Sequence, residues 1–233
     1  WCNEAQERYV LAIAAKDIDT GTVHTFHGST IEEGVRFLQG GDLLIFHNGI
    51  AYDIPVLNKL YPWFSVEPSK VLDTLVLGRL TYTNIKDIDM GLLKKQKLPG
   101  RLFGSHSLEA YGYRLGLMKG EYADEFKKAA GDSYKPGDEW KEFSQAMLDY
   151  NVQDVEVTAA LYLKLTSKNY SQMAIELEHQ MQWLMAQQVR NGFHFNEDKA
   201  AVLYSTLSQR RADLERELKE FFGSWEVKLP DFI

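Results

Sequence analysis

An uninterrupted run of apolar residues at positions 43–46 constrains the fold of this chain more than any other feature. A strand with one solvated face alternates apolar and polar residues, whereas a run without polar positions is typical of a strand covered on both faces. Two apparent strands, residues 9–14 and 22–26, precede the run as a hairpin, and helical spacing follows it at residues 52–61. Strands that alternate with helices predict an α/β fold, with a mixed sheet flanked by helices.

Start and stop signals place the remaining helices. Ser29 with Glu32, or Thr30 with Glu33, predicts a capping box at the start of one short helix. Residues 84–104, which carry four basic side chains around "LPG", are interpreted as a loop. We expect helices over residues 31–38, 105–116 (capped by Ser105), 143–164, 171–190 and 196–222 (capped by Asn196).

Strand potential disappears near Ser167, where we place a domain boundary between residues 1–166 and 167–233. No apolar run approaches the roughly 18–20 residues of a membrane span, and no signal peptide opens the chain, so we expect no membrane partner. Cys2 is the only cysteine, which excludes an internal disulfide and suggests a reducing compartment.

The charge balance narrows the class of function. A net charge of −7 argues against a protein that wraps nucleic acid by bulk attraction. It is compatible with an enzyme that binds only the end of a strand, because acidic groups can serve as metal ligands. Hydrophobic residues make up 45% of the chain and charged residues 25%, which is ordinary for a globular protein.

Two carboxylates stand out by their position. Asp53 follows the apolar run closely, and Asp154 lies on the stripe that Thr158 and Leu161 continue on the predicted helix 143–164. Tyr150 is four residues before Asp154 and therefore lies on the same face. An inward carboxylate is costly unless a cation or donors compensate it, so Asp53 and Asp154 could share a metal ion.

Simpler interpretations exist for each charged or polar candidate. Asp53 could be a charge that favours a helix N-terminus, and Tyr150 could be ordinary core packing. We interpret Asp73 as a helix cap and not as a metal ligand. Asp17 and Asp19 are expected in a hairpin turn, and a local hydrogen bond at the end of a strand is expected for His47. Solvated positions are expected for His24, His27, Asp149 and Glu156. Either phosphate contacts or solvation would explain Lys94, Lys95 and Lys97.

Two motifs resemble those of a known enzyme family. "NGIAYD" and "YNVQD" resemble the second and third motifs of the proofreading 3′→5′ exonucleases, in the DEDD group with tyrosine in its last motif. Longer segments, among them "FHNGIAYDIPVL", "DTLVLGRL" and "KLPGRLFGSHSLEAYGYRLGLMKGEY", resemble the replicative family A DNA polymerases of T-odd bacteriophages. "QQVRNGFHFN" resembles the hinge into their polymerase module. The resemblance covers almost the whole chain.

The resemblance implies a ribonuclease-H-like exonuclease domain over residues 1–166 and thumb-like helices of a polymerase module over residues 167–233. It implies metal-dependent hydrolysis of terminal phosphodiesters at single-stranded DNA ends, as in proofreading. Two Mg²⁺ ions, or Mn²⁺ in their place, would be the cofactors. The site residues would be Asp53 and Asp154 as metal ligands, Tyr150 to orient the attacking water, and Asn48 and Tyr52 to bind the terminal nucleotide.

The same resemblance implies the partners and the location. A single-stranded or frayed primer 3′ end would be the substrate, and the rest of the polymerase chain would be attached. A thioredoxin-type processivity factor could bind through a segment outside this chain. The enzyme would act in the cytoplasm of an infected bacterial cell.

The first motif of the family, Asp-x-Glu, has no counterpart in the chain. Aligning "RYVLAIAA" with the family's second strand places the missing pair just before Trp1. The parent protein could contain further residues there, the chain could be deliberately shortened, or the domain could be a degenerate one that binds DNA or a partner without cutting. We favour the first, because a sheet without its central strand loses hydrogen-bond partners. An exoribonuclease of the same fold is a further option, against which the phage-type hinge argues.

Overall fold

The computed structural model describes residues 9–117, 126–128, 131, 135 and 137–223. The chain forms two compact units, of which the first ends at Arg190 and the second begins at Asn191. The domain boundary that we expected near Ser167 stays a prediction. Within the described ranges, no helix is long and apolar enough to cross a membrane.

The predicted hairpin is confirmed, a few residues further along than expected. Strands β1 (Ala12–Lys16) and β2 (Val23–His27) pair antiparallel. Asp17 shapes the turn between them, because its Oδ1 accepts the N–H groups of Asp19 and Thr20, both at 2.9 Å. The bond from Thr20 in particular holds the pKa of the Asp17 carboxyl below its ordinary value. Asp17 therefore acts in the turn, as the spacing predicted.

The second sheet contains the apolar run. Strands β3 (Leu44–Phe46) and β4 (Val71–Asp73) pair in parallel, with Phe46 opposite Asp73. The run is only partly covered, because Leu43 precedes the strand and is 44% exposed while Leu44 is buried. The described strands thus form two two-stranded sheets and not the single mixed sheet that we expected. The fold is mixed α/β, and the ribonuclease-H-like arrangement stays a prediction.

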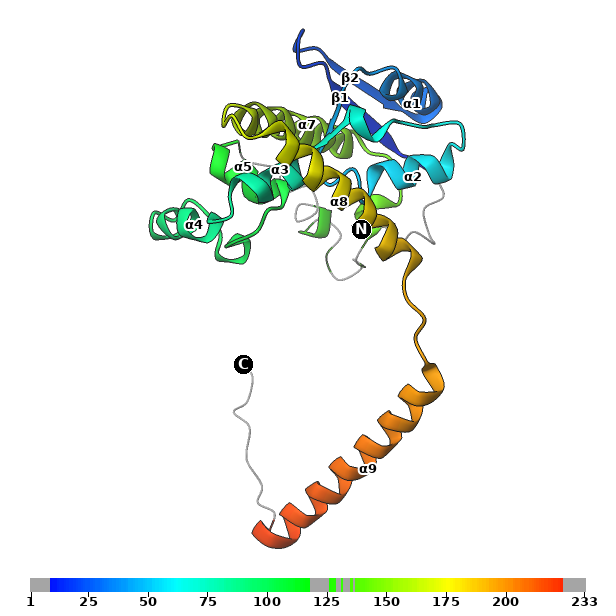
Figure 1. The fold of residues 1–233 in the computed structure, drawn as a ribbon, viewed down its shortest axis with the longest axis vertical. Helices are drawn as coiled ribbons and strands as arrows, with labels where there is room; N and C mark the ends of the chain where they lie inside the picture. The colour runs from blue at the N-terminus through cyan, green and yellow to red at the C-terminus, as the bar shows by residue number, and fades with distance from the viewer. Residues whose placement is uncertain (1–8, 118–125, 129–130, 132–134, 136, 224–233) are drawn as a thin grey trace. The chain divides into compact units, whose positions relative to one another are not determined.

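Helices surround these strands, and most of them lie where the sequence predicts (Figure 1). Helix α1 packs against the β1–β2 hairpin, while α7 packs against both sheets and against α3 and α5. Short 3-10 turns occupy Gly28–Thr30, Pro68–Lys70, Gly100–Leu102 and Asp138–Trp140. The helices of the first unit whose bounds the structure describes are α1 (Ile31–Gln39), α2 (Asp53–Leu60), α3 (Thr74–Thr81), α4 (Ile85–Lys94), α5 (Leu108–Leu115), α7 (Gln145–Thr166) and α8 (Gln172–Asn191).

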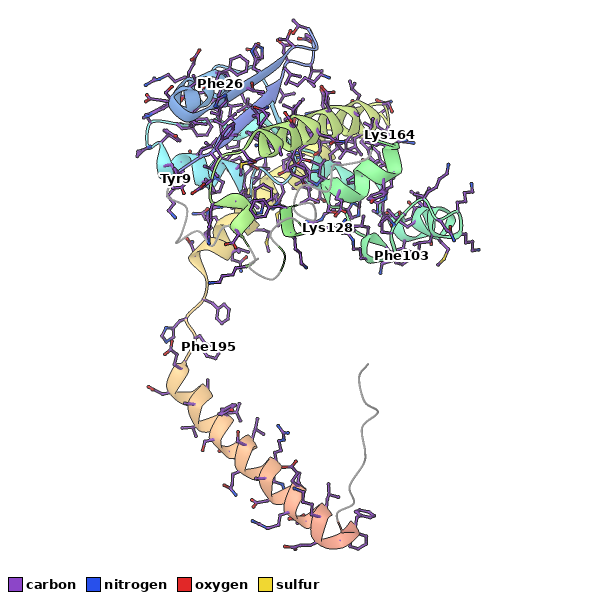
Figure 2. All side chains as sticks on the ribbon, turned by 180° about the vertical axis from the view of Figure 1, so that it is seen from behind. Tyr9, Phe26, Phe103, Lys128, Lys164 and Phe195 are labelled. Carbon is purple, nitrogen blue, oxygen red and sulfur yellow. The ribbon has the colours of Figure 1, made fainter. Side chains whose placement is uncertain are left out.

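Apolar side chains of the hairpin, α1, the start of α2 and α8 form one core cluster. Phe26 of the hairpin and Val35 of α1 belong to it, together with Ile50 and Ile54 near the start of α2. Figure 2 shows Phe26 at the hairpin end of the unit. Ala186 of α8 is buried in the same cluster, so the helix that leads toward the second unit is anchored in the core of the first.

Two predicted helix caps are wrong. Thr30 makes no side-chain cap at α1; instead its Oγ1 accepts the N–H of His27 at 3.0 Å, inside the preceding 3-10 turn. Helix α5 is capped by Ser107, whose Oγ accepts the Ala110 N–H, and not by Ser105. Both serines precede the helix in "SHSLEAY", and local spacing did not separate them.

The predicted basic loop over residues 84–104 is also wrong, because helix α4 occupies Ile85–Lys94. Asp89 is 0% exposed and forms an ion pair with Arg114 of α5. Arg114 Nε and Nη2 donate to the two carboxylate oxygens at 2.9 and 2.8 Å, and the Gly104 N–H donates to Oδ2 at 2.8 Å. Asp89 therefore ties α4 to α5 and to the segment between them.

The second unit contains a single described helix, α9 (Glu197–Phe222). Asn196 caps it as predicted, since its Oδ1 accepts the Lys199 N–H at 2.8 Å. None of its described residues is buried, and side chains project from all sides of the helix in Figure 2.

We predict that Asp89→Ala destabilises the protein by about 3–5 kcal/mol, because it leaves the Arg114 cation buried and uncompensated. Burial raises the pKa of Asp89, but the hydrogen bonds from Arg114 and Gly104 outweigh it and hold the pKa below 3.8. The contribution is therefore present above pH 3.8 and lost as the pH falls through the folded-state pKa. Chemical denaturation as a function of pH measures both effects.

Glu32→Gln is the matched control, because Glu32 pairs with Arg36 on the exposed surface of α1. It should cost less than about 1 kcal/mol. Equal losses for the two variants would contradict the structural role of Asp89.

Candidate functional site

The loop between β3 and α2 carries three of the predicted site residues. Asn48 adopts a left-handed backbone conformation with φ of 71°, which asparagine tolerates better than most residues. The Asn48 carbonyl accepts the Tyr52 N–H at 3.1 Å, which closes a turn ahead of the helix. Asp53 is the first residue of α2 and is half-buried, while Tyr52 is exposed. The structure thus brings Asn48, Tyr52 and Asp53 together at the start of one helix.

A buried carboxylate from the next strand holds this loop. Asp73 is 1% exposed, and its Oδ1 accepts the N–H groups of Asn48 and Leu75 at 2.8 and 2.9 Å. Its Oδ2 accepts the Ile50 N–H at 3.2 Å. The bond to Leu75 confirms the predicted cap at α3. The two bonds to the loop were not predicted. The sequence feature that could have suggested them is the unusual position of an aspartate at the end of an apolar strand.

Histidines extend the polar network beyond this loop. His47 Nε2 donates to the His106 carbonyl oxygen at 3.1 Å, and its Nδ1 is 2.9 Å from Thr74 Oγ1. Both of these bonds reach distant segments of the chain, and the local strand-end hydrogen bond expected for His47 stays a prediction. The His106 Nδ1 lies 2.7 Å from the Tyr111 hydroxyl. Burial, and then the charge of Arg114, lowers the pKa of His106.

Helix α7 carries the other two predicted site residues. Asp154 is half-buried and its Oδ1 is fully buried, and Leu161 on the same stripe has no exposed surface. The predicted inward orientation of Asp154 is confirmed. The ring of Tyr150 is half-buried, with its centroid 6.1 Å from that of Trp140.

The charges that we expected to be solvated on α7 behave differently from each other. Asp149 is exposed and accepts a hydrogen bond from Gln145 at 2.9 Å. The Glu156 side chain is 43% exposed, as expected of a solvated charge, and it also forms an ion pair with Lys16 of β1 at 2.6 Å, which was not predicted. This pair joins α7 to the hairpin.

The donor types fit a hard divalent cation, because carboxylate oxygens are the ligands that Mg²⁺ and Mn²⁺ prefer. Asp53 follows β3 by a short loop, and Asp154 lies on the helix that packs against β3. In the part of the chain that the structure describes, no group of three or more His, Cys, Asp or Glu side chains could hold a metal ion. A shared ion between Asp53 and Asp154 stays a prediction.

The described part of the chain is therefore a mixed α/β protein whose polar network orders a loop at the end of a parallel strand. No protein-family model matches the chain. The chain is 48% identical to the DNA-directed DNA polymerase of Escherichia phage T7 over 212 residues, which cover 79% of this chain and 30% of that protein. It is 44% identical to the DNA-directed DNA polymerase of Enterobacteria phage T3 over 240 residues, which cover 90% of this chain and 34% of that protein.

The chain is thus homologous to these phage DNA polymerases over most of its own length. It spans about a third of the length of these relatives.

We predict that Gly49→Ala destabilises the protein by about 1–3 kcal/mol, because the added Cβ would clash with the side chain of Phe46. Gly91→Ala is the matched control: its Cβ would meet nothing within 4 Å in helix α4, so it should stabilise by about 0.5–1 kcal/mol. Denaturant titration measures both. A neutral Gly49→Ala would mean that the loop is not packed against β3 as described.

Proposed function

We propose that this chain is the metal-dependent 3′→5′ exonuclease part of a phage-type replicative DNA polymerase. It would remove mispaired nucleotides from the single-stranded end of a primer. The observation that supports this most is the homology to the T7 and T3 DNA polymerases over most of the length of this chain. The ordered loop that carries Asp53 and the inward orientation of Asp154 are what a metal-binding role would need.

In the proposed reaction, Asp53 and Asp154 would hold part of the coordination shell of two Mg²⁺ ions, and the remaining ligands would have to come from outside the described residues. The bound ions would supply a nucleophilic water near neutral pH and a clamp for the charge that develops on the phosphate. The Tyr150 hydroxyl orients that water by a hydrogen bond.

Asn48 and Tyr52 would bind the terminal nucleotide. The exposed Tyr52 ring gives a base a surface on which to stack, and the Asn48 amide can donate and accept hydrogen bonds. A strand must leave the duplex to reach such a site, so the substrate would be a single-stranded or frayed 3′ end. The rest of the polymerase chain, and a thioredoxin-type factor bound to it, complete the proposed set of partners.

We predict that Asp154→Ala in the complete protein lowers the Mg²⁺-dependent degradation of 5′-labelled single-stranded DNA by at least about a hundredfold, because it removes a ligand of the proposed ions. Asp53→Ala should do the same. Asp149→Ala is the control on the same helix, since Asp149 is exposed, and its rate should stay near that of the wild type.

Three outcomes would separate the alternatives. Retained cleavage in both Asp53→Ala and Asp154→Ala would contradict the assignment. Binding of single-stranded DNA by the wild type without any cleavage would favour a module that only holds DNA. Faster degradation of RNA than of DNA would favour an exoribonuclease.

Tyr150→Phe offers a finer test, because it keeps the ring beside Trp140 and removes only the hydroxyl. We predict a fall in maximum rate of about tenfold to a hundredfold, matching the ~1.5–3 kcal/mol of a hydrogen bond to a charged group. The Mg²⁺ concentration for half-maximal rate should not change, since the hydroxyl is not a proposed ligand. A shift in metal dependence instead would show that Tyr150 acts through the ions.

A further inference from the structure

Helix α8 makes a direct hydrogen bond to the residue that holds the candidate loop. The His179 side chain, 7% exposed, lies beside the end of β4. Its Nε2 accepts the Asp73 N–H at 2.8 Å, and its Nδ1 lies 2.7 Å from the Ile175 carbonyl oxygen one turn earlier in α8. A carbonyl oxygen can only accept, so Nδ1 carries the proton and Nε2 is left as the acceptor. The helix itself therefore selects the tautomer that binds Asp73.

The chain of contacts continues from Asp73 into the loop. The main chain of Asp73 is held by His179, and its side chain holds the N–H groups of Asn48 and Ile50. Both Asp73 and His179 are buried, so water cannot readily replace either bond. A shift of α8 would move the Asp73 main chain, and with it the carboxylate on which the loop depends.

We propose that His179 is a positioning residue, through which helix α8 sets the position of Asn48 and Asp53. This inference rests on the proposed function only for the role of the loop in catalysis, because the hydrogen bonds exist whatever the loop binds. Since α8 lies in the segment that we assign to the polymerase module, the contact would make the editing loop sensitive to the position of that module's first helix.

Hydrogen–deuterium exchange on the complete, metal-free protein tests the linkage without any catalysis. His179→Leu removes the acceptor, so the amides of Asp73, Asn48 and Ile50 should exchange about tenfold faster. Ala186→Gly is the matched control, because it removes a buried methyl group from the same helix and keeps the hydrogen bond between His179 and Asp73. Ala186→Gly should leave the exchange rates of these three amides near those of the wild type. This should hold even if its denaturation midpoint equals that of His179→Leu, because a loss of overall stability alone does not break the bond to Asp73.

His179→Gln supplies the conservative rescue, since its amide oxygen can accept the Asp73 N–H and should restore most of the protection. If His179→Leu fails to fold, Asp73→Asn takes its place. That variant keeps the main-chain bond to His179 but places an NH₂ group against one of the N–H groups that the carboxylate accepts. It should speed the exchange of the amide that faces the NH₂ group, Asn48 or Ile50, while Asp73 itself stays protected.

The dependence of exonuclease rate on Mg²⁺ forms the second arm. His179→Leu should raise the half-activating Mg²⁺ concentration several-fold, with much of the maximum rate recovered at high Mg²⁺, because Asp53 is displaced and not removed. A mere loss of folded protein would lower the rate at every Mg²⁺ concentration alike.

The two arms fail separately. Unchanged exchange of Asn48 and Ile50 in both His179→Leu and Asp73→Asn would overturn the inference. So would equal exchange in His179→Leu and Ala186→Gly. Altered exchange together with a wild type that cleaves no DNA would leave the linkage standing and overturn the proposed function.

Discussion

The order of the candidate site depends on one buried carboxylate. An ionised aspartate removed from water is unstable unless donors surround it. Asp73 meets that demand with three main-chain N–H groups, from Asn48, Ile50 and Leu75. Hydrogen bonds to a charged group contribute about 1.5–3 kcal/mol each, which exceeds the modest cost of the left-handed conformation of Asn48. The loop thus supplies the donors that the buried Asp73 needs, and the Asp73 carboxylate in turn holds the loop in its shape.

The same residue connects elements that are far apart in the sequence. Asp73 ends β4, caps α3, holds the loop that leads into α2, and receives His179 from α8. His47 adds a second connection from the same loop to the segment before α5. A loop tied at several points presents Asn48 and Asp53 in a defined geometry, as a site that must position ligands within a fraction of an ångström requires.

Most helices and the hairpin could be predicted because their information is local. Apolar spacing located α1, α7 and α8, and the N-cap Asn196 located the start of α9. The prediction failed where a polar side chain has a distant partner. Helix α4 was taken for a loop because its segment is basic. The ion pair that anchors it, between Asp89 and Arg114, joins residues twenty-five positions apart. The ion pair of Glu156 was missed because its partner Lys16 lies on β1, far away in the sequence.

In the candidate site, too, the features that depend on local spacing could be predicted, and those that depend on distant partners could not. The inward orientation of Asp154 followed from the helical stripe that it shares with Leu161, and the cap at Asp73 followed from its place before α3. The bonds from Asp73 to the loop and to His179 could not follow from spacing, because each joins residues whose proximity exists only in the folded chain.

The central claim is that Asp53 and Asp154 bind the same divalent cations, and a double-mutant cycle on Mn²⁺ affinity tests it most directly. Calorimetry would compare the complete protein with Asp53→Asn, Asp154→Asn and the double variant. If the two carboxylates share ions, each single variant lowers the affinity by at least about tenfold and the double variant loses little more. Losses in binding free energy that simply add, or Mn²⁺ binding that neither substitution changes, would contradict the account.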